Sequence, residues 1–287
     1  MLQYDTLELY PTDECQLYCT GCYLHNGTNH WDYKTTSQII KSGIFKRVSK
    51  EVNILGGEPT LWEYLLKFLE EVRLENTKIK ITVTTNGVKL ISDKEYFKSF
   101  IQSCVENRII VNVSWHDNLE VIEVIKELKK YNILGFVIFV PNTIVNLESL
   151  DNIYNKLSLL CKCVWRPLIT TDIKYTFFSK KITNFLLSKS RKNIQSSRRM
   201  INRKIINNIE MIGKSNIDDK LYQQYECKCG RNGVIYVDGK LYHCLSQAIF
   251  KDKPISLYNK KEIKWKSCRY KFCCCDTFEL RDKKKKC

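Results

Sequence analysis

In the stretch Asp13-Glu14-Cys15-Gln16-Leu17-Tyr18-Cys19-Thr20-Gly21-Cys22-Tyr23, three cysteines follow one another at the spacing C-x3-C-x2-C. Three thiolates on a four-iron cluster leave one iron without a protein ligand, and an open iron is a place where chemistry can occur. A closed zinc site is the alternative, because His25 and His30 lie in the following loop. Zinc ribbons and knuckles mostly use C-x2-C pairs, so the spacing favours an iron-sulfur cluster at Cys15, Cys19 and Cys22.

A second motif, Val52-Asn53-Ile54-Leu55-Gly56-Gly57-Glu58-Pro59-Thr60, is a β-branched apolar run that ends in two glycines, a carboxylate and a proline. Gly56 and Gly57 allow the backbone to approach a ligand closely. Glu58, held before a proline, would present an anionic acceptor at the carboxyl end of a strand. Such a position suits a cationic amine.

The two motifs together, in this order and at this separation, resemble those of the radical S-adenosylmethionine (radical SAM) superfamily. The resemblance implies that Cys15, Cys19 and Cys22 hold a 4Fe-4S cluster, and that the Gly56-Gly57-Glu58 motif contacts the amino group of SAM. It also implies an enzyme that cleaves SAM reductively to a 5′-deoxyadenosyl radical, which abstracts hydrogen from a substrate. A reductant such as flavodoxin or ferredoxin would supply the electron.

From residue 7 to about residue 166, apolar strand-like runs alternate with amphipathic helix-like runs. The predicted strands are residues 7–10, 52–55, 79–84, 109–114, 135–140 and 163–166. Repeated βα units with buried strands indicate a parallel sheet. We therefore expect an α/β fold, and the resemblance implies a partial (β/α)6 TIM-like barrel with its site at the carboxyl ends of the strands.

Three of the intervening helices have a recognisable start or extent. One is expected after Thr60, where Thr60 and Glu63 form a capping box, and another opens at Ser92 with Glu95. A third is expected over residues 119–131, with its apolar side chains buried on one face. Each helix would connect two neighbouring strands.

Polar residues follow the later predicted strands, where a site at this edge of the barrel would be lined. In relatives the equivalent strand ends contact the ribose, carboxylate and adenine of SAM. The resemblance therefore implies SAM contacts from five residues, namely Thr85, Asn86, Ser114, Asn142 and Arg166. An ordinary turn is the alternative for Asn86. His116 is either a proton carrier for the substrate or a polar residue satisfied in a loop.

One position departs from the family pattern. Many relatives have an aromatic residue just before the third cysteine, near the adenine, whereas this chain has Gly21 there and Tyr23 just after it. We expect Tyr23 to take the stacking role from a shifted backbone.

A second cysteine-rich region lies late in the chain. Alternating residues on either side of the turn Asp238-Gly239 predict a β-hairpin with cysteines at its outer ends. The spacing Cys229-x9-Gly239-x4-Cys244 is similar to the first half of the auxiliary iron-sulfur domains called SPASM and Twitch. It is also similar to the auxiliary cluster region of the GTP-cyclising enzymes of molybdenum-cofactor synthesis. A zinc-stapled ribbon is the alternative.

The SPASM pattern is incomplete after the hairpin, where Cys268 is followed by Cys273-Cys274-Cys275. Adjacent cysteines cannot all ligate one cluster, so we expect a single auxiliary 4Fe-4S cluster in the smaller, Twitch-like form. Its candidate ligands are Cys227, Cys229, Cys244, Cys268, Cys273 and Cys275.

The pattern along the chain predicts three segments: a barrel over 1–172, a basic helical bridge over 173–222, and a C-terminal cysteine-rich β-hairpin and helical auxiliary-cluster domain over 223–287. The net charge of +16 is concentrated outside the barrel and the hairpin. Residues 173–222 hold 12 basic and 3 acidic side chains, and residues 251–287 hold 13 and 5. The bridge either has a solvated lysine-rich face or binds an anionic partner such as an acidic peptide, a nucleotide or RNA.

Fourteen cysteines in a chain without a signal peptide indicate metal ligation in a reducing cytoplasm rather than disulfides. The longest apolar stretch, residues 133–140, has the length of a strand, so no membrane partner is expected.

Two classes of function fit these features. The first is a radical SAM oxidoreductase that modifies a peptide or protein side chain, as in the maturation of ribosomally made peptides. The alternative is a radical SAM enzyme for a phosphorylated small molecule, nucleotide or RNA, which the basic bridge favours. A third reading, an iron-sulfur scaffold that never cleaves SAM, fits less well because the cysteine triad and Glu58 are both present.

Overall fold

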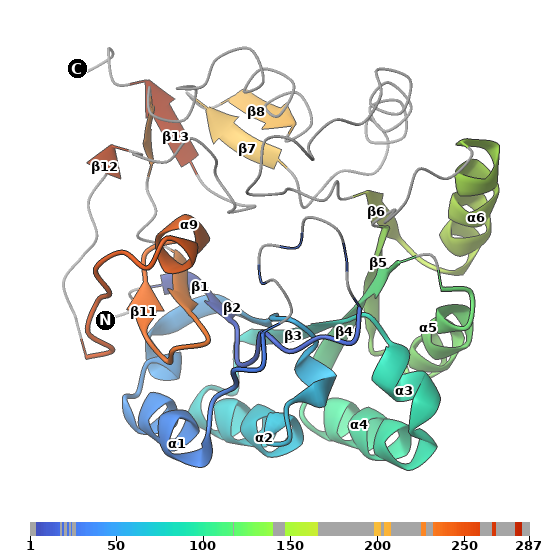
Figure 1. Ribbon diagram of the computed structural model, residues 1–287, viewed down its shortest axis with the longest axis horizontal. Helices are drawn as coiled ribbons and strands as arrows, with labels where there is room; N and C mark the ends of the chain where they lie inside the picture. Colours follow the sequence, from blue (N-terminus) through green and yellow to red (C-terminus); the bar gives the residue numbers. More distant parts are fainter. Residues whose placement is uncertain are drawn as a thin grey trace.

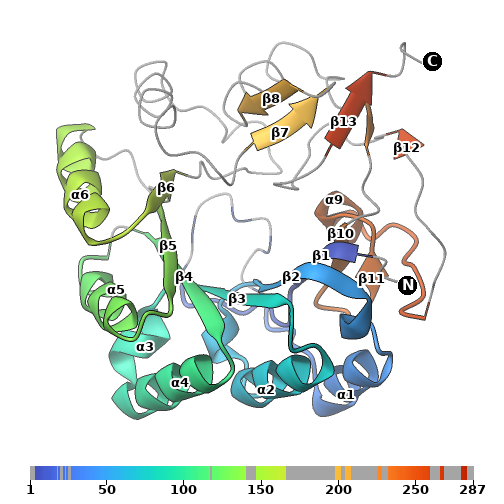
Figure 2. The same ribbon diagram turned by 180° about the vertical axis from the view of Figure 1, so that it is seen from behind.

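In the computed structural model the described residues form two β-sheets, and helices cover the outer side of the larger one (Figure 1 and Figure 2). The structure describes residues 4–17, 19, 22, 24, 27–116, 118–139, 147–165, 198–201, 204–207, 225–227, 232–258, 266–267 and 279–282.

The larger sheet contains six parallel strands that are neighbours in chain order. They are β1 (Tyr4–Leu9), β2 (Val48–Ile54), β3 (Lys80–Thr85), β4 (Ile109–Trp115), β5 (Leu134–Phe139) and β6 (Cys163–Trp165). All six correspond to strands predicted from the sequence. The α/β class with a mostly parallel sheet is therefore confirmed.

Helices connect these strands and pack on one side of the curved sheet (Figure 1). They are α1 (Tyr33–Lys41), η1 (Phe45–Arg47), η2 (Pro59–Leu61), α2 (Leu65–Glu75), α3 (Val88–Ser92), α4 (Lys94–Glu106), α5 (Val121–Lys130) and α6 (Leu147–Leu160), where η denotes a 3-10 helix. The predicted helix over 119–131 is confirmed as α5, in which Val121, Val124, Ile125 and Leu128 are buried.

Two predicted helix starts are wrong. Thr60 does not cap α2, because its N–H and its hydroxyl both donate to the Glu58 carboxylate within η2, and α2 begins only at Leu65. Ser92 is the last residue of α3, and Asp93 is the N-cap of the next helix, α4, where it accepts the N–H of Tyr96.

Aromatic side chains fill the space between the sheet and the first two helices. The rings of Trp31 and Trp62 meet edge to face at 5.7 Å, and Phe68 of α2 packs against both. The indole N–H of Trp62 donates to the carbonyl of Trp31 at 2.9 Å. This buried cluster fixes the segment that leads from the cysteine-rich loop into α1.

The late hairpin joins the larger sheet. Its strands are β10 (Asn232–Ile235) and β11 (Leu241–Tyr242), followed by the short helix α9 (Leu245–Ile249). β10 pairs parallel with β1, and the indole N–H of Trp31 donates to the carbonyl of Tyr236 at 2.8 Å. The predicted turn is present, with Gly239 at φ +70°. The hairpin therefore shares one sheet and one core with the barrel strands, while the division of the chain at residues 172 and 222 stays a prediction.

The second sheet has the strand order β12-β9-β13-β7-β8 and lies on the side of the molecule opposite α1, α2 and α4 (Figure 1 and Figure 2). Its strands are β7 (Arg198–Ile201), β8 (Lys204–Asn207), β9 (Tyr225–Cys227), β12 (Lys266–Ser267) and β13 (Glu279–Asp282). β7 and β8 fall within the segment predicted as basic helices, so that prediction is wrong for these two ranges. The rest of 173–222 lies outside the described residues.

Within the described part of the chain, no helix combines the length and the apolar character needed to cross a bilayer.

Candidate active site

The loop that carries the three cysteines is closed at its base by a pair of side chains. The Asp13 carboxylate accepts the backbone N–H of Asn29 at 2.7 Å and its side-chain amide at 2.8 Å. The backbone of Asp13 also donates to the carbonyl of Asn29, and Trp31 donates to the carbonyl of Pro11. Asp13 and Asn29 were not predicted from the sequence, which carries no signal that pairs them.

Gly56 and Gly57 let the end of β2 pack directly on the start of this loop. Gly57 donates to the carbonyl of Thr12 at 2.8 Å, and Glu58 donates to the carbonyl of Glu14 at 2.7 Å. A Cβ on Gly57 would stand 2.1 Å from the carbonyl oxygen of Glu14, and Gly56 has a φ of +136°. The described contacts of these glycines are thus with the chain itself, and a contact with SAM stays a prediction.

The Glu58 carboxylate is buried, with 1% of its surface exposed. Its Oε1 accepts the N–H and the hydroxyl of Thr60 and the hydroxyl of Thr85 at 3.1, 2.7 and 2.6 Å. Its Oε2 accepts the backbone N–H of Asn86 at 2.6 Å. Burial raises the pKa of Glu58, and these hydrogen bonds partly oppose the rise because they favour the charged form.

Cys15, Cys19 and Cys22 are thiols rather than disulfide-bonded cysteines, and all three are partly exposed. The Cys15 sulfur accepts the N–H of Leu17 at 3.4 Å and lies 3.6 Å from the side-chain nitrogen of Asn86. The Cys22 N–H donates to the carbonyl of Cys19 at 3.1 Å.

Burial raises the pKa of Cys15 to about 12. That pKa already includes a lowering by the N–H of Leu17 and smaller increases from the negative charges of Glu58, Cys19 and Cys22. The three thiols and the carboxylate therefore share one electrostatic neighbourhood. In the part of the chain that the structure describes, no three His, Cys, Asp or Glu side chains converge on a point where one metal ion could sit.

The donor set of these cysteines fits an iron-sulfur cluster. Thiolates are the ligands that such clusters use, and N–H groups directed at the sulfurs are one of the ways in which a protein sets their potential. Both features are present at Cys15, through Leu17 and Asn86. His30, one of the alternative zinc ligands, has an exposed side chain, and its backbone bridges to Thr12.

The structure brings two of the predicted SAM contacts to this site but gives them partners within the chain. The Thr85 hydroxyl donates to Glu58 and accepts the N–H of Gly87. The side chain of Asn86 reaches Cys15 and Gln16. Ser114 is partly buried near the end of β4. Their contacts with SAM stay predictions.

His116 lies beside the cysteine loop, with its Nδ1 3.7 Å from the Cys19 sulfur. It is therefore next to a predicted cluster ligand, as expected of a residue at the carboxyl end of β4. Its role in moving a proton stays a prediction.

Cys244 is the described member of the predicted auxiliary set whose side chain can be placed. It is buried at the N-cap of α9. Cys227 is the last residue of β9. The remaining predicted residues Tyr23, Asn142, Arg166, Cys229, Cys268, Cys273 and Cys275 lie outside the described residues.

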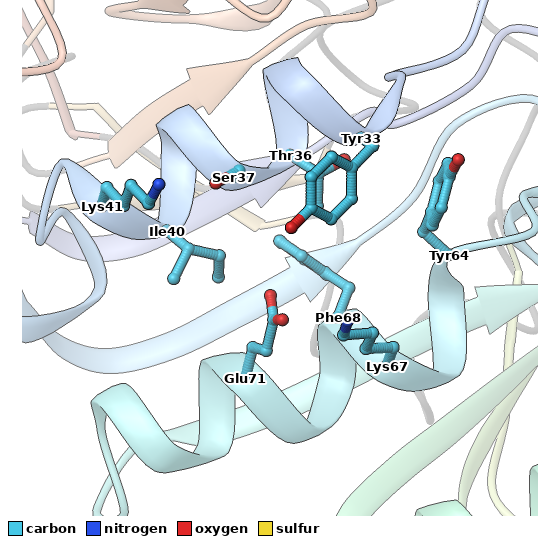
Figure 3. A pocket seen from close by; sticks show the side chains of 9 residues that line it. All are labelled: Tyr33, Thr36, Ser37, Ile40, Lys41, Tyr64, Lys67, Phe68 and Glu71. Atoms are coloured by element: carbon cyan, nitrogen blue, oxygen red, sulfur yellow. The ribbon is translucent and has the colours of Figure 1, made fainter.

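A surface pocket of about 230 Å³ lies between α1 and α2 and contains none of the predicted site residues. Figure 3 shows Tyr33 and Tyr64 at one end and Lys41 at the other, with Glu71 between the helices. The ammonium group of Lys67 lies 5.9 Å from the centre of the Tyr33 ring.

Residues 9–157 match the model of the Radical SAM superfamily, a span that includes the cysteine triad, Glu58 and strands β2 to β5. The chain belongs to the radical SAM superfamily. Membership in this superfamily of enzymes implies a 4Fe-4S cluster and SAM as cofactors, and it agrees with the resemblance drawn from the two motifs.

Two curated relatives match a short part of the chain. The GTP 3′,8-cyclase of Paenarthrobacter nicotinovorans is 32% identical over 91 residues, which are 29% of this chain and 25% of that protein. The GTP 3′,8-cyclase of Petrotoga mobilis is 35% identical over 94 residues, or 30% and 28% of the two chains. The matched region thus spans little more than a quarter of these relatives.

Two solved structures of radical SAM enzymes share the fold over most of the chain. SuiB of Streptococcus suis with bound S-adenosylmethionine has a TM-score of 0.60 at 17% identity and covers 90% of this chain and 62% of SuiB. The enzyme anSMEcpe, with bound AdoMet and the Cp18Cys peptide, has a TM-score of 0.55 at 18% identity, with coverage of 88% and 77%. At these identities the likeness concerns the fold alone.

Proposed function

We propose that this chain is a radical SAM oxidoreductase that acts on a peptide or protein side chain. The observation that carries the proposal is the buried Glu58 carboxylate, which lies in the electrostatic neighbourhood of Cys15 and pairs with no Lys or Arg among the described side chains. A buried carboxylate without a counter-charge is costly. The amino group of SAM would supply that charge.

The chain's own residues have distinct parts in this proposal. Cys15, Cys19 and Cys22 would hold the 4Fe-4S cluster, and the free acceptor position on Glu58 would bind the amine. When bound, the cluster and SAM supply the radical chemistry, while the protein orients the reactants and excludes water. His116, which lies beside Cys19, would hold or move a proton near the reacting groups.

The fold supports a peptide as the substrate. One of the two enzymes with the same fold was solved with the Cp18Cys peptide bound, and this chain covers most of its length. An acidic peptide would also complement the excess of basic residues in 173–222 and 251–287.

A nucleotide is the second candidate substrate. The sequence similarity to the two GTP 3′,8-cyclases favours it. Their sequence identity to this chain is higher than that of SuiB or anSMEcpe, but the matched region covers less of the chain. The same basic segments would bind phosphate groups.

We further propose one auxiliary 4Fe-4S cluster, held by Cys227 or Cys229 with Cys244, Cys268 and one cysteine of the triplet at 273–275. The described strand pairing supports this set. β9 pairs antiparallel with β12, so Cys227 lies opposite Lys266, two residues before Cys268. In the β10–β11 ladder Val234 pairs with Tyr242, which directs Cys244 toward Asn232, three residues after Cys229.

The cofactor part of the proposal is tested by anaerobic reconstitution and by counting iron and sulfide. Two 4Fe-4S clusters would give about eight of each per chain. Changing Cys15, Cys19 and Cys22 together to Ala should remove about half of the iron, and the same change at Cys104 and Cys163, which lie in α4 and β6, should remove none. Full iron in the triple variant, or zinc in the wild type, would refute the cluster assignment.

The substrate part is tested by hydrogen transfer. The reconstituted enzyme is given SAM, a strong reductant and either deuterated GTP or deuterated short acidic peptides from open reading frames beside its gene. Abstraction from a substrate places deuterium in 5′-deoxyadenosine, which mass spectrometry detects. Deuterium from the peptides supports the first candidate, and deuterium from GTP alone replaces it with the second.

A further inference from the structure

The side chain of Asn86 bridges the end of β3 and the cysteine loop. It is 6% exposed, and its Nδ2 lies 3.6 Å from the Cys15 sulfur and 3.4 Å from Oε1 of Gln16. Its Oδ1 accepts the backbone N–H of Val88 at 2.9 Å. Because the oxygen of an amide side chain accepts hydrogen bonds and its NH2 group only donates them, this bond settles which end of the amide faces Cys15: the NH2 group does.

The backbone of Asn86 is held in place by Glu58. The Asn86 N–H donates to Oε2 of Glu58, and the Thr85 hydroxyl donates to Oε1 while it accepts the N–H of Gly87. These bonds fix the backbone of Asn86 and its two neighbours, Thr85 and Gly87. The amide is therefore aimed at the sulfur by a rigid, buried network rather than by an exposed loop.

We propose that Asn86 is a positioning residue for Cys15, which it serves by donating an N–H···S hydrogen bond that raises the reduction potential of the cluster. A hydrogen-bond donor at a thiolate draws negative charge from the sulfur. It therefore stabilises the reduced cluster, which carries one more electron, more than the oxidised cluster. Asn86 then acts on the electron that enters the cluster, a role different from the SAM contact expected from the sequence. The inference rests on the proposed function, because it needs the cluster at Cys15, Cys19 and Cys22.

The first test measures the midpoint potential of the cluster in the reconstituted full-length protein without SAM. Asn86→Asp keeps the size of the side chain and the acceptor for Val88 but removes the donor. Asn86→Leu removes the donor without adding a charge. Both variants should have a more negative potential than the wild type. Asn107→Asp is the matched control, since its amide donates to the carbonyl of Ser103 at the end of α4, and it should keep the wild-type potential.

The outcomes separate the two proposals. A wild-type potential in both Asn86 variants, or a shift in Asn86→Asp alone, overturns the hydrogen bond and leaves the cluster assignment standing. A wild-type protein that takes up no 4Fe-4S cluster overturns the proposed function and this inference together.

A second measurement needs no variant and decides the matter if either Asn86 variant fails to fold or to bind iron. The wild-type protein is prepared with 15N-labelled asparagine side chains, and the reduced cluster is studied by pulsed electron paramagnetic resonance. A hydrogen bond to Cys15 should give a 15N coupling from an asparagine amide. Its absence from the wild-type spectrum would overturn the inference.

Discussion

The Glu58 carboxylate has four donors from its own chain and about four lone-pair positions to offer them. Three of the donors crowd on Oε1 and a single one, the Asn86 N–H, reaches Oε2. The remaining acceptor capacity is thus on Oε2, which the Asn86 N–H also contacts. Glu58 joins the ends of β2 and β3, and under the proposed function the remaining position would accept the amine of SAM.

We expect Glu58→Ala to weaken SAM binding. Loss of a charged hydrogen bond is worth about 1.5–3 kcal/mol, or roughly a 10- to 150-fold increase in Kd. The variant should also lower the thermal stability of the cluster-free protein, because it leaves the buried donors of Thr60, Thr85 and Asn86 without an acceptor. Equilibrium dialysis with labelled SAM and thermal unfolding measure the two effects.

The control for this prediction is Glu63→Ala, which removes an exposed carboxylate five residues further along the chain. Glu63→Ala should change neither the SAM affinity nor the thermal stability. An unchanged SAM affinity in Glu58→Ala would remove the assignment of the Gly-Gly-Glu-Pro motif to the amine.

At the residue scale the sequence predicted positions better than partners. Thr85 and Asn86 were placed correctly at the end of a strand, yet their described bonds are to Glu58 and Cys15. Those partners depend on how closely the end of β2 packs on residues 12–14, which the two glycines permit and which no spacing in the sequence encodes. Asp13 and Asn29 were missed for the same reason, since their pairing follows from loop closure.

Strands were the elements best predicted, because a buried parallel strand is a short apolar run that differs clearly from its polar flanks. Helix starts were less well predicted. A Thr or Ser before an acidic residue signals a cap only if its hydroxyl is available, and that of Thr60 is taken by Glu58, while Ser92 ends the preceding helix. β7 and β8 were missed although they pair with each other; the other sheet neighbour of β7 is β13, which lies far along the chain.

Asp93 at the start of α4 should make the stability of the folded protein change with pH in the acid range. The hydrogen bond from Lys89 holds the pKa of Asp93 below its usual value, and the N–H of Tyr96 adds to the effect. A lowered pKa in the folded state gives stability that is present above the unfolded pKa of about 3.9 and is lost as the pH falls through the folded value.

We therefore expect Asp93→Asn, which keeps an acceptor for Tyr96 but has no charge, to have a lower Tm than the wild type at pH 7. The difference should shrink as the pH falls below about 4. Thermal unfolding of the cluster-free protein at several pH values measures it. A difference that is the same at pH 7 and pH 3 would show that the charge of Asp93 is not the cause.

Gly233 of β10 lies where the hairpin meets β1. A Cβ there would stand 2.9 Å from Cδ1 of Leu7 and 3.1 Å from Cε1 of Tyr4. Since overpacking a close-packed core costs about 1–3 kcal/mol, Gly233→Val should lower the free energy of unfolding by that amount. Denaturant unfolding measures the change. Gly43→Asn is the control, because nothing lies near a Cβ at that position and Asn tolerates its φ of +64°. Equal stability of Gly233→Val and the wild type would contradict the observed packing.

For the molecule as a whole, the hairpin connects Cys244 to the barrel. Cys244 follows β11, which pairs with β10, which in turn pairs with β1, the strand that leads into the cysteine loop. Cys244 of the proposed auxiliary site is therefore attached to the sheet whose strand β1 leads to Cys15.

We expect Cys244→Ala to cleave SAM to 5′-deoxyadenosine but to form no product, since the radical arises at the Cys15 cluster and the second cluster would serve a later electron or the substrate. Chromatography of 5′-deoxyadenosine and of product separates the two steps. Cys104→Ala, which removes a buried thiol in α4, should keep both SAM cleavage and product formation. Product formation by Cys244→Ala at the wild-type rate would reduce the late cysteines to a structural role.

The pairing of β1 with β10 also affects the order in which the protein can assemble. Thr6 pairs with Asn232, so the two strands are 226 residues apart in the chain. A nascent chain emerges from its N-terminus, and one side of β1 then exposes unpaired N–H and C=O groups until residues 232–235 have been made. Exposed strand edges favour association between chains. A protein that ends at residue 231 should accordingly form oligomers that light scattering detects. A protein extended to residue 258 should not form them. A monomeric 1–231 fragment would show that the edge of β1 is protected in another way.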